Sequence, residues 1–190
     1  MSVPLPHSPA PAATLSLTDL TVVRQLVGVK GPKAAQWLAN LGLPLPETAN
    51  HWLALDDDRL IARLGLSEFL LDGPPGSLDT LAATPRTHGV YPVLRQDAAF
   101  LLCGAGAPEL LAQVCSLDFA TLEVTPGALA LTSMAGVGVT LLPQPGDGGS
   151  RYRLWCDGSY GLYLWETLRE IAEALGGDAV DAQTCTESLP

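Results

Sequence analysis

The chain has 190 residues, of which 16% are charged, and its net charge is −10 with only ten Lys and Arg residues in total. A phosphate backbone requires a concentrated basic surface, so this composition argues against a nucleic-acid-binding protein. No apolar run approaches the ~20 residues that a membrane-spanning helix needs, which argues against a membrane protein. The charged fraction lies well below the ~25% usual for soluble domains, and this indicates that a partner covers part of the surface.

The first feature in chain order is a Pro- and Ala-rich segment, MSVPLPHSPAPAAT, which has neither the basic nor the apolar region of a signal peptide. We expect residues 1–19 to form a disordered tail and residues 177–190 to form a flexible one. The four cysteines include no CxxC pair and mostly lie in apolar contexts, as reduced thiols of cytoplasmic proteins do. The sequence therefore predicts a cytoplasmic protein whose folded part spans residues 20–176.

Two segments resemble each other, VKGPKAAQWLANL (29–41) and LCGAGAPELLAQV (102–114), when they are aligned at an offset of 73 residues. In both segments apolar residues recur at i, i+3, i+4 and i+7, a spacing typical of one buried helix face. The residues at these positions are Ala34, Trp37, Leu38 and Leu41 in the first segment and Ala107, Leu110, Leu111 and Val114 in the second. Each predicted helix, 32–41 and 108–115, follows a short apolar strand and a glycine. The pattern predicts an internal repeat.

The segments that follow the two helices are also alike. RLIARLGLSEFLLD (59–72) is typical of two strands joined by a turn at 65–67, and residues 128–157 predict three strands with a turn at Gly136 and a polar loop at 143–150. Residues 160–175 carry the clearest helix pattern. We therefore predict an α+β fold of two related β-α-β-β-like halves, 20–72 and 89–176.

The Gly-Ala-Gly turn at 104–106 resembles the start of a phosphate-binding loop. A dinucleotide fingerprint would place a third glycine where Glu109 stands, and a carboxylate there would repel a phosphate. The matching loop of the first half, KGPK, has a single glycine, and neither loop carries a Walker lysine. We interpret these glycines as a structural turn from strand into helix.

The remaining candidate groups do not form a recognisable site. The histidines, His7, His51 and His88, lack the spacing of a metal site, and the acidic triplet at 56–58 is typical of a solvated turn. The sequence thus predicts no catalytic, cofactor-binding or metal-ligating residues. Trp52 and Tyr91 lie at or near the ends of predicted segments, and exposed aromatic residues are enriched at protein interfaces. We take both as candidate partner contacts, with a structural role as an equal alternative for each.

The order and spacing of four segments resemble the gamma subunit of heterotetrameric sarcosine oxidase, a family related in fold to the folate-binding part of the aminomethyltransferases of glycine cleavage. These segments are GVKGPKAAQWLANLGLPLP, LGLSEFLLD, LCGAGAPELLAQVCSLDF and YRLWCDGSYGLYLWETL. The resemblance covers residues 20–176. The segment RTHGVYPVLRQ departs from it, because it follows the family's Asp-x-Ser-containing segment only loosely.

The resemblance implies a non-catalytic subunit that packs against the larger, flavin-binding subunits of a heterotetramer. FAD, FMN, NAD and tetrahydrofolate would be bound by those partners, with no cofactor in this chain. Such a complex oxidises the N-methyl group of sarcosine and yields glycine, hydrogen peroxide and a one-carbon unit that passes to folate. The alternative is a stand-alone folate-binding one-carbon protein of the aminomethyltransferase type, which would need a buried carboxylate facing the pterin ring.

Overall fold

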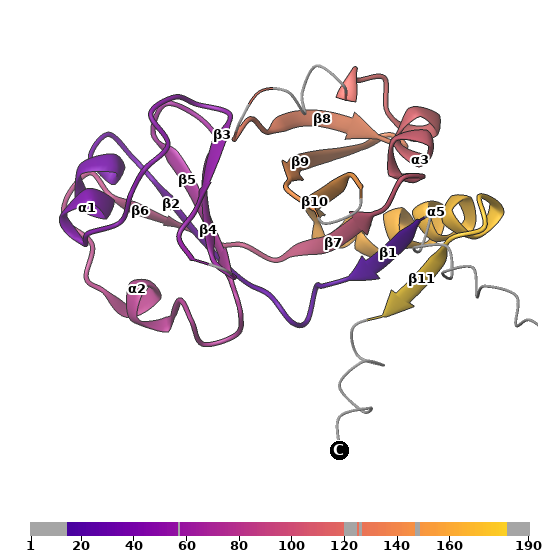
Figure 1. Ribbon diagram of the computed structural model, residues 1–190. Coiled ribbons are helices and arrows are strands. Elements are labelled where there is room, and N and C mark those ends of the chain that lie inside the picture. Colours follow the sequence, from indigo (N-terminus) through magenta and orange to yellow (C-terminus); the bar gives the residue numbers. More distant parts are fainter. Residues whose placement is uncertain (1–14, 57, 120–124, 126, 147–148, 182–190) are drawn as a thin grey trace, which may run out of the picture.

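The computed structural model describes residues 15–56, 58–119, 125, 127–146 and 149–181. Their strands form two sheets (Figure 1). Sheet A contains, in spatial order, β11 (Asp178–Asp181), β1 (Ser16–Asp19), β7 (Asp97–Cys103), β10 (Arg151–Asp157), β9 (Val137–Gln144) and β8 (Ala130–Met134). Sheet B contains β3 (His51–Ala54), β4 (Leu60–Arg63), β5 (Glu68–Gly73), β2 (Gln25–Lys30) and β6 (Tyr91–Val93). The helices are α1 (Ala34–Asn40), α2 (Asp79–Ala83), α3 (Ala107–Val114) and α5 (Gly161–Ala174), the last preceded by the 3₁₀ turn η1 (Gly158–Tyr160).

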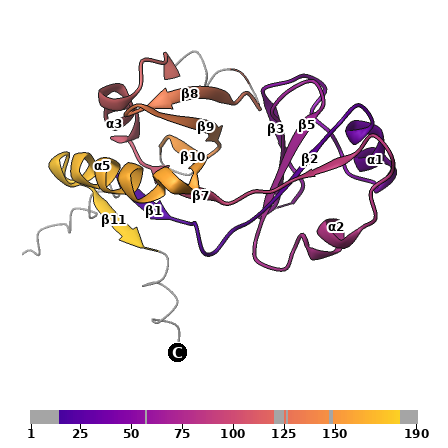
Figure 2. The ribbon, with the colours of Figure 1, turned by 180° about the vertical axis from the view of Figure 1, so that it is seen from behind.

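The two sheets face each other, and the helices lie on their outer sides (Figures 1 and 2). One apolar cluster packs α1 and the start of α2 on sheet B, and a second packs α3 and α5 on sheet A. A third cluster fills the space between the sheets and is formed by Trp52, Leu60, Ala62, Leu70, Ala99, Leu129, Leu142 and Trp155. The chain therefore has the predicted α+β architecture, in which two helix-covered sheets share an apolar junction.

The predicted repeat is confirmed in the positions of the helices. Helix α1 begins at Ala34 and α3 at Ala107, which are 73 residues apart, and the strands before them end at Lys30 and Cys103 with the same offset. The buried residues of the two helices match in the same way, and they are Ala34, Trp37 and Leu38 in α1 and Ala107, Leu110 and Leu111 in α3. Identical periodicity has thus produced equivalent buried faces in both halves.

The glycine turns before these helices have a structural role, as predicted. Gly31 and Gly104 have φ values of 126° and 107°, a backbone conformation that residues other than glycine rarely adopt. The Gly31 N–H donates to the Ser67 carbonyl at 2.9 Å, and the Gly104 N–H donates to the Ser150 carbonyl at 2.9 Å. Because these N–H groups bond to the neighbouring strand connections, they are not available to cradle a phosphate.

The predicted hairpins and the final helix are also confirmed. Strands β4 and β5 flank the turn at 65–67, and β8 and β9 are joined at Ala135 and Gly136, whose φ values of 49° and 83° are typical of a tight hairpin. Helix α5 buries Leu164 and Leu168 against sheet A. Among the described residues, none of these helices is both long and apolar enough to span a bilayer.

The two halves exchange their first strands. β1 directly precedes β2 in the chain but pairs with β7 of the other half, and β6 directly precedes β7 but pairs with β2. The chain therefore passes between the sheets twice, at the β1–β2 and β6–β7 connections (Figures 1 and 2). This reciprocal pairing ties the two halves together through backbone hydrogen bonds as well as through the apolar junction.

The strands at the two ends correct the predicted domain boundaries. β1 lies within the segment 1–19 that we expected to be a disordered tail, and β11 lies within the tail predicted for 177–190. The two strands pair in parallel, and Leu15 and Leu17 are 1% and 0% exposed in the core of the second half. The Pro- and Ala-rich composition before β1 concealed a short segment whose alternate residues are buried. Residues 1–14 and 182–190 of the two predicted tails lie outside the described residues.

We predict that Leu17→Ala lowers the free energy of unfolding by about 2–5 kcal/mol, because it leaves a cavity in the core beside β7. Val22→Ala is the matched control, since Val22 lies just after the same strand but is 55% exposed; we expect its effect to stay within about 0.5 kcal/mol. Urea unfolding followed by circular dichroism measures both. Equal effects of the two substitutions would show that β1 is not part of the core.

Candidate functional site

The central polar feature of the junction is the carboxylate of Asp72, which is fully buried. β5 is buried on both faces, with Phe69 and Leu71 in the core beneath α1 and Leu70 in the cluster between the sheets. Side chains alternate along a strand, so Asp72 shares the face of Leu70 and lies in the junction. The same alternation on β10 puts Arg153 and Trp155 into the junction from the opposite sheet.

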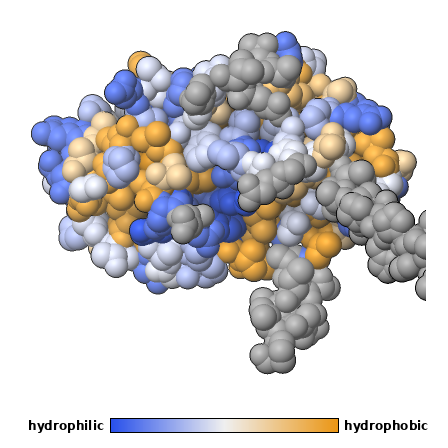
Figure 3. Space-filling view, in the orientation of Figure 1, coloured by the Kyte–Doolittle hydropathy of each residue, from blue (hydrophilic) through white to orange (hydrophobic). Residues whose placement is uncertain are grey.

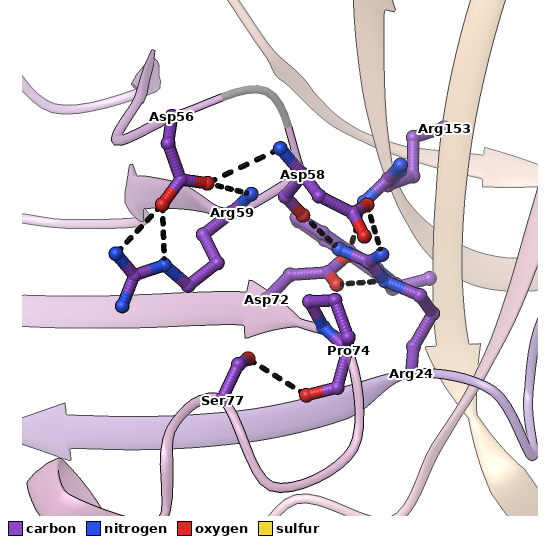
Figure 4. Close-up of polar contacts among 9 residues, drawn as sticks. Arg24, Asp56, Asp58, Arg59, Asp72, Pro74, Ser77 and Arg153 are labelled. Atoms are coloured by element: carbon purple, nitrogen blue, oxygen red, sulfur yellow. Dashed lines mark hydrogen bonds and ion pairs between the residues drawn. The ribbon is translucent and has the colours of Figure 1, made fainter.

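Three donors surround this carboxylate, one from the segment before β2 and two from β10, and Figure 4 shows the two arginines among them. Arg24 Nε donates to Asp72 Oδ1 at 2.6 Å, while Arg153 Nη1 and Trp155 Nε1 donate to Oδ2 at 2.9 and 3.2 Å. Arg24 also donates from Nη1 to Asp58 Oδ1 at 2.6 Å, at the edge of the junction. Two guanidinium groups and two carboxylates therefore neutralise one another between the sheets.

This ion cluster is structural rather than catalytic in its geometry. Both Asp72 oxygens are already bound, and burial lowers the pKa of Arg153 although Asp72 opposes that shift. A buried charge that keeps its partners is tolerated, whereas a buried charge without them is strongly destabilising. The cluster accordingly fixes how the segment before β2, the end of β5 and the middle of β10 lie relative to one another.

Beside the cluster, a cleft opens between β3 and the ends of β9 and β10. Its outer hollow has a volume of about 1060 Å³ and is lined by residues 46–48, 51–54, 125, 127, 143–145 and 149–151. An inner hollow of about 400 Å³ shares Trp52, Gln144 and Arg151 with it and extends to Arg153. The cleft therefore runs from the surface to the ion cluster.

Several polar groups along this cleft have no partner. Among the described residues, six buried side-chain nitrogen or oxygen atoms lack a hydrogen bond, and four of these belong to residues that line the two hollows. These four atoms are Trp52 Nε1, Gln144 Oε1, Arg151 Nε and Arg153 Nε. An unpaired buried polar atom costs about 1–3 kcal/mol, so such a concentration marks the cleft as the best candidate for a binding site.

The structure separates the two residues that were predicted to contact a partner. Tyr91 is 50% exposed on the edge strand β6, in agreement with the predicted exposure. Trp52 is only 9% exposed, because it packs in the cluster between the sheets and its backbone N–H donates to the Gly127 carbonyl at 2.7 Å. Of the two alternatives for Trp52, its burial therefore favours the structural role, since residues 127–129 cover this edge of sheet B.

The other candidate groups lie apart or are engaged in structure. No cluster of three or more potential metal ligands occurs among the described residues, and His7 lies outside them. In the acidic triplet, Asp56 pairs with Arg59 and Asp58 with Arg24. Burial raises the pKa of the Cys156 thiol to about 11, so this thiol is not a nucleophile at neutral pH.

Sequence reasoning missed the residues that matter most in the junction, namely Arg24, Asp72, Arg151 and Arg153. A usable signal was present in two of the predicted strands. In EFLLDG and RYRLWCD, charged residues fall on one face of a strand whose other residues are apolar. An ionisable side chain in such a position must either face solvent or find a buried partner.

No model of a known protein family matches the sequence, and no curated protein matches it. Several solved structures match the chain, and two examples cover most of its length. One chain of the heterotetrameric sarcosine oxidase from Corynebacterium sp. U-96, in complex with pyrrole 2-carboxylate, is 21% identical with a TM-score of 0.71, and the match covers 87% of each chain. The glycine cleavage system aminomethyltransferase T from Bartonella henselae is 18% identical with a TM-score of 0.63. That match covers 82% of this chain and 45% of the aminomethyltransferase. The fold is aminomethyltransferase-like.

This result confirms the predicted fold class. In this chain each half has one strand, a helix and three further strands, in the order β2-α1-β3-β4-β5 and β7-α3-β8-β9-β10. At these identities the likeness concerns the fold, and the chemistry of the chain has to be argued from its own residues.

We predict that Asp72→Asn destabilises the protein by about 3–5 kcal/mol, because it leaves two buried guanidinium groups without their carboxylate. Asp58→Asn is the control, since its side chain is 61% exposed and its pair with Arg24 contributes about 0–1 kcal/mol. Guanidinium-induced unfolding measures both. A small effect at Asp72 would mean that the ion cluster does not hold the halves together.

Proposed function

We propose that this chain is a non-catalytic gamma subunit of a heterotetrameric sarcosine oxidase. The observation that carries the proposal is the match to one chain of the Corynebacterium enzyme, with a TM-score of 0.71 over 87% of both chains. The complex would oxidatively demethylate sarcosine to glycine, with formation of hydrogen peroxide and a folate-bound one-carbon unit. This chain would stabilise the assembly rather than carry out that chemistry.

The buried ion cluster favours a subunit over a stand-alone folate-binding protein. A pterin pocket was expected to need a buried carboxylate facing the ring. Among the described residues, Asp72 is the buried carboxylate, and Arg24, Arg153 and Trp155 occupy both of its oxygens. The group that could recognise a pterin therefore serves the packing of the two halves.

The exposed apolar side chains also favour a subunit. Leu66, Leu94 and Leu162 are 86%, 82% and 71% exposed, and Tyr91, Tyr160 and Tyr163 are about half exposed. Figure 3 shows hydrophobic residues gathered over the first half, on the side of α1 and α2, with hydrophilic residues at the front of the junction. Large apolar side chains on a chain with few charges are typical of surfaces that a partner covers.

The partners in this proposal are the larger, flavin-binding subunits of a cytoplasmic complex. FAD, FMN, NAD and tetrahydrofolate would belong to those subunits and none to this chain. Tyr91 is our proposed contact residue. Trp52 is buried, so it could take part only through the part of its ring that lines the cleft.

We predict that the chain is poorly soluble or self-associates when expressed alone and that co-expression with the flavin-binding subunits yields a stable complex. Tyr91→Asp should reduce the amount of complex at least tenfold, because an unpaired charge would be buried at the interface. Gel filtration with detection of flavin absorbance measures the assembly.

Tyr91→Phe is the matched control and should leave assembly unchanged, since it keeps the ring and adds no charge. A clean monomeric chain that the flavoprotein subunits never retain would refute the subunit proposal and favour a stand-alone one-carbon protein. Normal assembly of Tyr91→Asp would show that the interface lies elsewhere on the surface.

A further inference from the structure

The outer hollow of the cleft has the dimensions and walls of a small-molecule site. Its volume of about 1060 Å³ is slightly above the ~300–1,000 Å³ common for ligand pockets. Pro46, Pro143, Pro145 and the ring of Trp52 give it rigid apolar walls. Such walls favour a ligand with an apolar body.

The polar side chains of this hollow include the guanidinium group of Arg151. Gln144 and Arg151 are direct cross-strand neighbours on β9 and β10, and Trp52 reaches the same hollow from β3. Gln144 Oε1, Arg151 Nε and Trp52 Nε1 are all buried and unpaired, and Trp52 as a whole is more than nine-tenths buried. The three residues therefore line one hollow, and each keeps a buried polar atom that has no partner among the described residues.

Arg151 also differs from Arg153 in that no carboxylate of the described residues forms an ion pair with it. Arg151 and Arg153 share one face of β10, and Asp72 neutralises only Arg153. Among the described residues, Arg151 forms neither an ion pair nor a side-chain hydrogen bond, although it is half-buried. The other charged or titratable groups that line the outer hollow are Glu47 and His51, and the His51 ring already bonds to Thr48 and to the Ala49 carbonyl.

We propose that the outer hollow binds a small organic anion, with the carboxylate of the ligand on Arg151 and its apolar body against the prolines and Trp52. A guanidinium group pairs with a carboxylate through parallel N–H donors. This site is independent of the proposed subunit function, because it rests on groups within this chain.

Benzoate is a suitable probe, since it combines a carboxylate with a flat apolar ring. Equilibrium dialysis of the full-length chain against labelled benzoate should give one saturable site per chain. Arg151→Gln should weaken binding at least tenfold, Arg151→Lys should retain part of it, and Trp52→Phe should weaken it several-fold while keeping the charge. Arg169→Gln is the control, because Arg169 is an exposed arginine on α5, and it should bind benzoate as the unaltered chain does.

Two further probes separate the parts of the proposal. Benzamide has the same ring without the charge, and inorganic phosphate has the charge without the ring, so both should bind at least tenfold more weakly than benzoate. Non-saturable binding of benzoate would overturn the proposal. It would also be overturned if Arg151→Gln bound benzoate as well as the unaltered chain does and unfolded at the same temperature. Binding of benzamide or phosphate as tight as that of benzoate would overturn it too. Binding to the free chain that disappears in an assembled complex would also overturn it, because a partner segment would then be the natural occupant.

Discussion

The arrangement of the whole chain depends on one carboxylate, Asp72, that has no access to water and is bound by two guanidinium groups. Arg24 comes from the connection between the exchanged strand and sheet B, and Arg153 comes from the middle of sheet A. A buried charge tolerates little displacement of its partners, because desolvation makes each lost contact expensive. Apolar packing between the sheets would permit many relative positions of the halves, and these directional contacts select one.

The strand exchange and the ion cluster reinforce each other. Arg24 follows the exchanged strand β1 by five residues, so the pairing of β1 with β7 brings its guanidinium toward β10.

The open cleft is a consequence of the same arrangement. Arg153 is oriented by Asp72, and Arg151 lies two residues earlier on the same face, where it forms no ion pair with a described carboxylate. The ion cluster thus leaves the guanidinium group of Arg151 without a charge partner among the described residues, at the cleft between the two halves.

The parts of the fold that could be predicted from the sequence are those that local periodicity determines. The helix faces at Trp37 and Leu110, the hairpin at Gly136 and the glycine turn at Gly104 each follow from a short pattern. The exchange of β1 and β6 could not be predicted, because pairing between segments more than 60 residues apart leaves no local trace. The choice between the two roles of Trp52 stayed open for the same reason, since the segment that covers it comes from residues 127–129.

The scarcity of charge has a different meaning once the ion cluster is known. Two of the ten basic residues are buried in the junction against one buried carboxylate, so the exposed surface is more acidic than the net charge of −10 suggests. The negative electrostatic potential of this surface would repel a ligand or partner that carries negative charge. Recognition of such a molecule must therefore come from short-range contacts at a site that excludes water. Arg151 provides such a place because its Nε is buried. The rest of the surface offers apolar side chains such as Leu94 and Leu162, on which a larger partner could pack without requiring charge complementarity.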